Sequence, residues 1–482
     1  MIETNLGQVT FITTGKLDAN AQDANGLYPF FTCGEENLTI NTAAFDTEAV
    51  LLAGNGNFSV KYYKGKFNAY QRTYVIEPNM VDGKWLYYLV MHHIAKITAG
   101  ARGSTIKYLR IGDITDCSVN LVSLTHQKRI VAKIEELFSE LDNGIAALKS
   151  AREQLKVYRQ AVLKHAFEGK LTAKWREENA DKLESPEQFL ARIHQEREAR
   201  YQQQLEEWKA AVTAWEENGK EGKKPSKPKE PEKAQFEDAK FQIPISWATT
   251  KLGFITEVSG GLTKNQKRNT LPQKMKYLRV ANVYADKLLL DDIQEIGVTE
   301  AEAIKVSLVL NDLLVVEGNG SVDQIGRVAL WDASIENCGH QNHLIRVRFD
   351  NPDYARFIML FLLSPIGRDL IVKEASSTSG LHTLSISKVS NLQIPLISLS
   401  ESDQLMKIVD EKLTLASKFE SELDTELQRA ETLRQSILKK AFSGQLVPQD
   451  PNDEPASELL ARIQAEREAT KTKSTKKARK AK

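Results

Sequence analysis

Hydrogen-bonding side chains concentrate in one loop of the chain, Ser259–Asn269, which reads SGGLTKNQKRN. After two glycines, five consecutive residues carry them: Lys264, Asn265, Gln266, Lys267 and Arg268. Arg and Lys can bridge O6 and N7 of guanine, whereas Asn and Gln match N6 and N7 of adenine. The loop is therefore a candidate for contact with nucleic-acid bases, and an ordinary solvated loop is the alternative.

A second stretch, Thr13–Asn25, stands at the corresponding place near the start of the chain and is less basic. Its candidate contacts are Lys16, Asn20 and Gln22. Because it also offers amide and amine donors, it is a weaker candidate for the same kind of contact, and an ordinary solvated loop is again the alternative.

Two further segments combine glycine with small hydroxyl residues, which lets a backbone approach phosphates closely. They are Gly100–Lys107 and its counterpart Ser376–His382. Their candidate residues are Arg102, Ser104, Lys107, Ser379 and His382. Contact with phosphate alone would set affinity and salt dependence rather than sequence choice. A simple turn before the last strand is the alternative.

Three other motifs favour structural roles. The run from Cys338 to His343 lacks the four well-spaced ligands of a zinc site and favours a turn. The run Asn351–Tyr354 (NPDY) favours a helix start, with Asp350 or Asn351 as the cap. The runs Gly54–Gly56 and Gly318–Gly320, both G-N-G, favour hairpin turns, since neither continues into a phosphate-binding Gly-Lys-Ser/Thr.

The elements that position these residues occur twice. RQAVLKHAFEGKL at Arg159–Leu171 returns as RQSILKKAFSGQL at Arg434–Leu446. FLARIHQEREA at Phe189–Ala199 returns as LLARIQAEREA at Leu459–Ala469. Because the copies are far apart, they indicate a duplicated module rather than a continuous solenoid.

Each copy includes a long helix. Apolar residues recur at three-and-four spacing from Ile130 to Val162 and again from Ala416 to Ala441. Such a helix, with one narrow apolar stripe, needs a partner helix, and the other copy is the obvious one. Gly169 and Gly444 follow the stripes and suit helix C-caps.

A segment of mixed character precedes each helix. Both segments contain short β-rich runs between glycine-bearing turns and a helix near the end, which indicates an α+β domain. The expected strands are Ala49–Leu52, Thr73–Ile76, Leu313–Val316 and Leu344–Val347, and the expected helices are Lys84–Lys96 and Pro352–Leu363. LLAGNGN at residues 51–57 faintly echoes LLVVEGNGSV at 313–322.

We therefore expect six regions. A first globular domain covers residues 1–125, a conserved helical region 126–200, a charged connector 201–240, a second globular domain 241–400, a second helical region 401–470 and a basic tail 471–482. The Lys/Pro/Glu-rich stretch 219–231 favours a flexible connector. Three scattered cysteines fit a reducing cytoplasm, and no apolar run is long enough for a membrane span.

In this order of elements, the chain resembles the specificity subunit of type I restriction–modification systems over its full length. The resemblance is carried by QKRIVAKI at 127–134, the two AF-x-G-x-L helix ends, IPISWATTKLGFI at 243–255 and PQDPNDEPASELLARI at 448–463.

The resemblance implies two target-recognition domains separated by two long antiparallel helices that form a coiled coil, with pseudo-twofold symmetry. Each domain would read one half of a split, asymmetric site in double-stranded DNA. It implies two methyltransferase subunits and two restriction subunits as partners. S-adenosylmethionine, ATP and magnesium would serve those partners, with no cofactor bound by this chain.

Two alternatives remain at this point. One is an enzyme in its own right, against which the absence of a cofactor-binding motif argues. The other is a coiled-coil scaffold that tethers two protein-binding domains.

Overall fold

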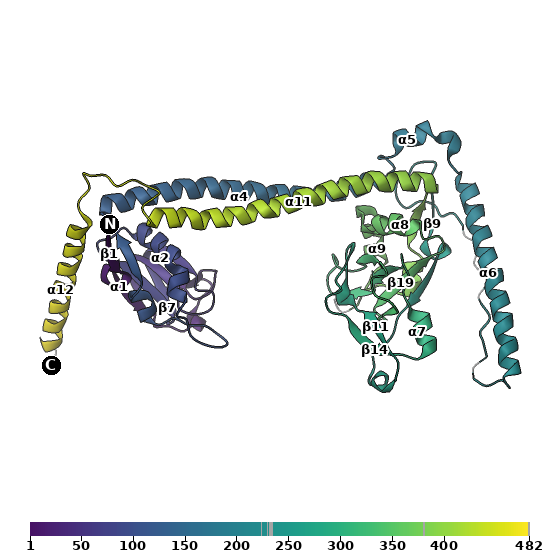
Figure 1. Ribbon diagram of the computed structural model, residues 1–482, viewed down its shortest axis with the longest axis horizontal. Coiled ribbons are helices and arrows are strands. Elements are labelled where there is room, and N and C mark those ends of the chain that lie inside the picture. The colour runs from purple at the N-terminus through teal and green to yellow at the C-terminus, as the bar shows by residue number, and fades with distance from the viewer. Residues whose placement is uncertain (223, 229, 231–234, 379–380, 481–482) are drawn as a thin grey trace. The chain divides into compact units, whose positions relative to one another are not determined.

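The computed structural model describes residues 1–482 apart from 223, 229, 231–234, 379–380 and 481–482. The chain forms two compact units. Unit 1 combines Met1–Ala151 with Glu422–Lys482, and unit 2 is Arg152–Ser421. Each unit contains one globular domain of strands and short helices, together with part of each long helix (Figure 1).

The globular domain of unit 1 is built on a six-stranded sheet in the order β2-β7-β5-β6-β3-β4. All neighbours are antiparallel except β3 and β6. Strands β1 and β8 form a separate antiparallel pair. The elements are β1 (Ile2–Asn5), α1 (Leu6–Val9), β2 (Thr10–Thr14), η1 (Ala19–Ala21), β3 (Tyr28–Phe31), β4 (Leu38–Ile40), β5 (Phe45–Ala53), β6 (Val60–Ala69), β7 (Thr73–Pro78), α2 (Gly83–Thr98), α3 (Ile111–Thr115) and β8 (Ser118–Leu121).

The globular domain of unit 2 has a four-stranded antiparallel sheet in the order β10-β19-β15-β17, and smaller sheets surround it. Its strands are β9 (Ala248–Lys251), β10 (Thr256–Gly260), β11 (Lys274–Leu278), β12 (Val283–Tyr284), β13 (Lys287–Leu288), β14 (Gln294–Gly297), β15 (Leu313–Val316), β16 (Gly318–Asn319), β17 (Val328–Leu330), β18 (Cys338–His340), β19 (Leu344–Phe349), β20 (Ser376–Thr378), β21 (Leu381–Thr383) and β22 (Gln393–Leu396). Its helices are η3 (Leu252–Phe254), η4 (Gln266–Thr270), η5 (Val280–Asn282), α7 (Glu300–Val306), α8 (Tyr354–Leu363), α9 (Pro365–Glu374) and α10 (Ile386–Ser390).

The two domains share a core topology. The strands β2-β7-β5-β6 of the first correspond, in chain order and in sheet order, to β10-β19-β15-β17 of the second. The pair β1–β8 corresponds to β9–β22, and the short helix α3 corresponds to α10. Other elements are inserted between these. They are β3 and β4 in the first domain, and β11–β14, α7, β18, α9 and β20 in the second. The expected α+β domains are thus two versions of one framework.

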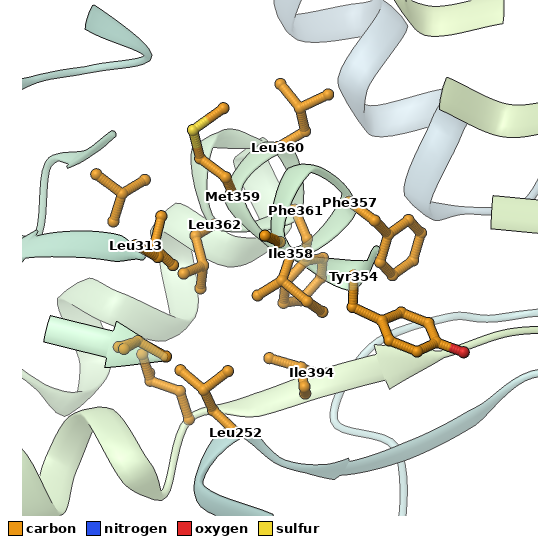
Figure 2. Close-up of a cluster of buried hydrophobic side chains, with 14 of the residues drawn as sticks. Leu252, Leu313, Tyr354, Phe357, Ile358, Met359, Leu360, Phe361, Leu362 and Ile394 are labelled. Atoms are coloured by element: carbon orange, nitrogen blue, oxygen red, sulfur yellow. The ribbon is translucent and has the colours of Figure 1, made fainter. Parts of the chain in front are cut away.

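The core of unit 2 centres on α8, which is apolar on nearly every side and therefore buried (Figure 2). Phe357, Ile358 and Phe361 are fully buried in it, among residues from the β15–β19 sheet such as Leu313. Phe167, from the end of a long helix, joins the same core. The helix begins at Tyr354, two residues after the expected start, and neither Asp350 nor Asn351 is its N-cap.

The long helices are α4 (Leu124–Phe167) and α11 (Leu399–Phe442), each of 44 residues. In unit 1, Arg434 of α11 forms an ion pair with Asp142 of α4 and lies over the Phe138 ring. In unit 2, Arg159 of α4 pairs with Glu420 of α11 at 3.0 Å. Unit 1 also contains the ion pair of Arg129 with Asp453, and unit 2 that of Arg176 with Glu401. Within each unit, residue numbers thus rise along one partner as they fall along the other, so the helices pair antiparallel. Arg159 and Arg434, equivalent in the sequence repeat, make equivalent contacts.

Both long helices end in the same glycine cap. Gly169 and Gly444 adopt φ of 69° and 79°. At the first end, the N–H of Gly169 donates to Ala166 O, and that of Lys170 donates to His165 O. The same two bonds recur at Gly444 and Gln445. These are Schellman motifs, as the position of the glycines predicts.

The two caps differ in what covers them, which gives a prediction. A Cβ at Gly169 would collide with the ring of Pro244, whereas one at Gly444 would meet the flexible end of the Met1 side chain. We expect Gly169→Ala to cost about 2 kcal/mol or more, and Gly444→Ala about 1 kcal/mol, since both add left-handed strain but only the first meets a rigid ring. Urea unfolding checks this, and equal losses would contradict it.

Each helix end supports the domain of its own unit. Phe167 packs edge-on against Phe357 and Phe361 in unit 2, with both ring centroids 5.3 Å away. Phe442 lies against Trp85 in unit 1, at 6.1 Å. The first sequence copy thus completes the second domain, and the second copy completes the first.

The remaining helices are α5 (Ala173–Glu178), η2 (Ala180–Lys182), α6 (Pro186–Glu217) and α12 (Ala456–Lys480). Helix α6 starts with a capping box between Ser185 and Gln188. It continues to Glu217, well into the charged stretch expected to begin the connector at residue 201. No described helix is long and apolar enough to cross a bilayer.

The repeated EREA segments dock α6 and α12 onto the domains in the same way. In unit 2, Arg197 of α6 donates to the carbonyl of Phe254. In unit 1, the equivalent Arg467 of α12 donates to the carbonyl of Gly7. The duplicated framework therefore holds each domain by the same arginine.

Candidate nucleic-acid interface

The loop after β10 is held in place by Arg268. Its guanidinium makes two bonds to the carboxylate of Glu302, at 3.1 and 2.8 Å, and also donates to Thr263 O and Gly297 O. The Arg268 side chain is only 12% exposed. This arrangement gives Arg268 a structural role in holding the loop, and its contact with bases stays a prediction.

The other four candidates of this loop, Lys264, Asn265, Gln266 and Lys267, are all exposed. Asn265 is the N-cap of η4, and Gln266 and Lys267 are its first two residues. Lys264 precedes them, directly after Thr263, whose carbonyl accepts from Arg268. Glu302 is itself fixed, since it forms a capping box with Thr299 at the start of α7. The ion pair with Arg268 and the Thr299 N–H together lower the pKa of Glu302 to about 2. The arrangement presents two lysines and two amide side chains on a loop that is fixed by the Arg268–Glu302 ion pair.

Separate substitutions distinguish the two roles. Lys267→Ala should weaken DNA binding without changing stability, since its side chain is exposed. Arg268→Ala should cost about 1–3 kcal/mol, because it removes charged hydrogen bonds. The depressed pKa of Glu302 means that this stabilisation is present above the unfolded pKa of about 4.3 and is lost as pH falls toward 2. Urea unfolding of wild type and both variants between pH 7 and pH 3 measures the free energy of unfolding. A difference between wild type and Arg268→Ala that does not change with pH would contradict the prediction.

The corresponding loop of the first domain follows β2. Lys16, Asn20 and Gln22 are all exposed, and Asn20 lies in η1. In both domains, one residue after the first strand of the sheet forms an isolated parallel β-bridge. Leu17 bridges to Tyr70, and Leu262 bridges to Gln341. The two loops predicted to be equivalent therefore leave the shared framework at the same point.

The two candidate phosphate segments, Gly100–Lys107 and Ser376–His382, also occupy equivalent places in the two domains. In the first domain, Arg102 forms an ion pair with Asp113 at 3.1 Å, while Ser104 and Lys107 are exposed. In the second domain, His382 lies in β21 and is half-buried. Ser379 lies outside the described residues. Both segments come immediately before the equivalent helices α3 and α10.

The motifs expected to be structural are built into the fold. His340 is fully buried, and its Nδ1–H donates to Val306 O at 3.1 Å. Burial lowers the pKa of His340 to about 4 and raises that of Cys338 to about 12. Tyr354 of the NPDY run is buried, and its hydroxyl donates to Ile397 O at 3.3 Å.

One exposed group was not identified from the sequence. Arg327 lies over the ring of Tyr284, with its guanidinium carbon 4.7 Å from the centroid. Tyr284 is 41% exposed. Exposed aromatic rings with nearby cations stack on unpaired bases in proteins that bind single-stranded nucleic acid. The two residues are 43 positions apart and meet only through the fold, so no local pattern signals the pair.

Comparisons with known proteins show which family the chain resembles. A family model described as the type I restriction modification DNA specificity domain matches residues 3–149. The chain is 32% identical to the EcoDI specificity subunit of Escherichia coli over 96% of this chain and 95% of that protein. It is 26% identical to the StySPI specificity subunit of Salmonella potsdam, over 79% and 70%.

A solved structure supports the fold. It belongs to a study of complex assembly and conformational transition of the type I R-M system, and it matches with a TM-score of 0.57 and 14% identity. The match covers 92% of this chain and 98% of that one. On the identity to the EcoDI subunit over nearly its whole length, this chain belongs to the specificity subunits of type I restriction enzymes.

Proposed function

We propose that this chain selects the DNA target of a type I restriction–modification complex by reading two unlike half-sites, one with each globular domain. The observation that carries the proposal is the pairing of a shared framework with different insertions. The same four-stranded core and the same docking arginines, Arg197 and Arg467, recur in both units. The loops that leave this framework differ in length and in charge.

Different loops on one framework support an asymmetric target. Two identical domains would favour a palindrome, because symmetric readers match symmetric sites. Here the first domain offers Lys16, Asn20 and Gln22, whereas the second offers two lysines among amides in Lys264–Lys267. The target would therefore be bipartite and non-palindromic.

The duplicated surfaces support two copies of one partner. Arg192 pairs with Glu184 in unit 2, and the equivalent Arg462 pairs with Glu454 in unit 1. Two methyltransferase subunits, using S-adenosylmethionine, would dock on such repeated helical surfaces. Two restriction subunits, using ATP and magnesium, would complete the complex in the cytoplasm. We assign catalysis to these partners and target choice to this chain.

Mapping methylated adenines in a genome that carries this chain and its methyltransferase partner tests the proposal. We expect one bipartite sequence with two different halves separated by a fixed gap. A complex that methylates without any sequence preference would refute the proposal and favour a scaffold that tethers other proteins.

A further inference from the structure

The two G-N-G runs lie at equivalent hairpin tips. In the first domain, residues 54–59 connect β5 to β6. In the second, residues 317–327 connect β15 to β17. Since β5 and β6 correspond to β15 and β17 in the shared sheet, these hairpin tips are the same feature of the framework.

Each hairpin tip pairs with the candidate phosphate segment of its own domain. In the first domain, Leu109 N–H donates to Gly54 O at 2.8 Å, and Gly56 N–H donates to Lys107 O at 3.3 Å. Asn55 is bridged to Tyr108 between these bonds. The hairpin tip and the segment around Lys107 therefore form one small ribbon.

The second domain repeats the ribbon. Leu384 N–H donates to Glu317 O at 2.7 Å, and Asn319 pairs with His382 across β16 and β21. By this pairing, His382 takes the place of Lys107, and Asn319 that of Gly56, so the G-N-G runs are offset by one residue. The ribbon therefore lies at the same place in both domains, although the G-N-G sequence is displaced by one residue.

Both ribbons leave the backbone open to a large ligand. A Cβ at Gly56 or at Gly320 would meet no atom within 4 Å. Gly320 does not have a positive φ, so neither packing nor backbone strain requires glycine there. Asn57 and Ser321, which follow, are exposed hydrogen-bonding side chains. Open glycine backbone beside small polar residues and a Lys or His suits the close approach of phosphate.

We propose that the two hairpin tips, each with the residues paired to it (107–109 in the first domain and 382–384 in the second), are equivalent anchors for the phosphodiester backbone of DNA. They hold each domain on the duplex regardless of sequence, while the inserted loops of each domain read bases. This inference rests on the proposed function. Within each domain, it assigns the phosphate contacts, which both half-sites share, and the base contacts, which differ between half-sites, to different segments.

Two serines of the second domain provide a matched test. Ser321 lies at the hairpin tip, and Ser334 lies beyond the other end of β17. Both are exposed, and the backbone N–H of each donates to a side-chain oxygen two residues earlier, on Asn319 and on Asp332. Ser321→Asp and Ser334→Asp therefore add the same charge at similar turns and differ in distance from the proposed anchor. Because the Ser334 side chain also hydrogen-bonds the Asp332 carboxylate, urea unfolding of both variants checks that neither loses its fold.

The measurement is equilibrium binding of DNA by the complex of this chain with its methyltransferase subunits, at several salt concentrations. One duplex carries the target sequence identified by mapping methylated adenines, and the other has both halves of that sequence scrambled. We expect Ser321→Asp to weaken both by about tenfold, with an unchanged ratio and a shallower salt slope, because it repels phosphate. Ser334→Asp should bind like wild type. Asn57→Asp should repeat the Ser321→Asp result in the first domain.

Two results would overturn the anchor. One is Ser321→Asp binding both duplexes like Ser334→Asp, and the other is Ser321→Asp weakening only the target, which would make the hairpin tip a base reader. If wild type does not discriminate between the duplexes, the proposed function fails instead, and the loss of non-specific affinity in Ser321→Asp still decides the anchor.

Discussion

Replacing Phe167 by Ala is expected to destabilise unit 2 by about 3–5 kcal/mol, the usual cost of removing a buried phenylalanine ring. Phe167 is fully buried and contacts the rings of Phe357 and Phe361 on α8. A loss of this size approaches the whole stability of many domains. Urea unfolding, followed by a probe in the second domain, measures it.

Tyr158 supplies the control on the same helix. It is 40% exposed, so Tyr158→Ala should change the free energy of unfolding by no more than about 0.5 kcal/mol. If both substitutions cost the same, the end of α4 does not belong to the core of the second domain.

Lengthening both long helices is expected to abolish modification of the original target. Inserting seven residues in α4 near Ala151 and seven in α11 near Ser421 keeps the apolar stripe in phase. It lengthens each helix by about 10 Å, or about three base pairs of DNA. If the helices set the gap between half-sites, methylation should move to a site with a longer gap or be lost, as sequencing of methylated adenines would show.

The matched variant has the insertion in α4 alone. It leaves the two helices unequal, so pairs such as Arg159 with Glu420 and Arg434 with Asp142 cannot both form. We expect failure of assembly with the methyltransferase subunits. If the double insertion left the gap between half-sites unchanged, the helices would not set that gap.

The helical framework was predictable because its signals are local. The three-and-four spacing and the glycines at 169 and 444 predicted the long helices and their ends, and α4 and α11 confirm both. The four expected strands lie within β5, β7, β15 and β19.

The rest depends on contacts between residues distant in the sequence. The structural contacts of Arg268 are one case, since its partner Glu302 lies 34 residues away in the sequence. The longer α6 is another case, since Trp208 and Trp215 donate to backbone carbonyls of the segment that follows the helix, at Pro225 and Gly222. No periodicity or composition encodes such partners.

The makeup of unit 1 bears on how the protein is synthesised. Its hydrophobic core needs Leu438, Phe442, Leu459 and Ile463 in addition to the first domain. All residues of unit 2 precede position 422. A ribosome therefore releases everything that the second domain requires while the first still lacks part of its interior. Of the two domains, the one translated earlier is completed later, and a nonsense codon in the second repeat would damage the domain encoded before the first repeat.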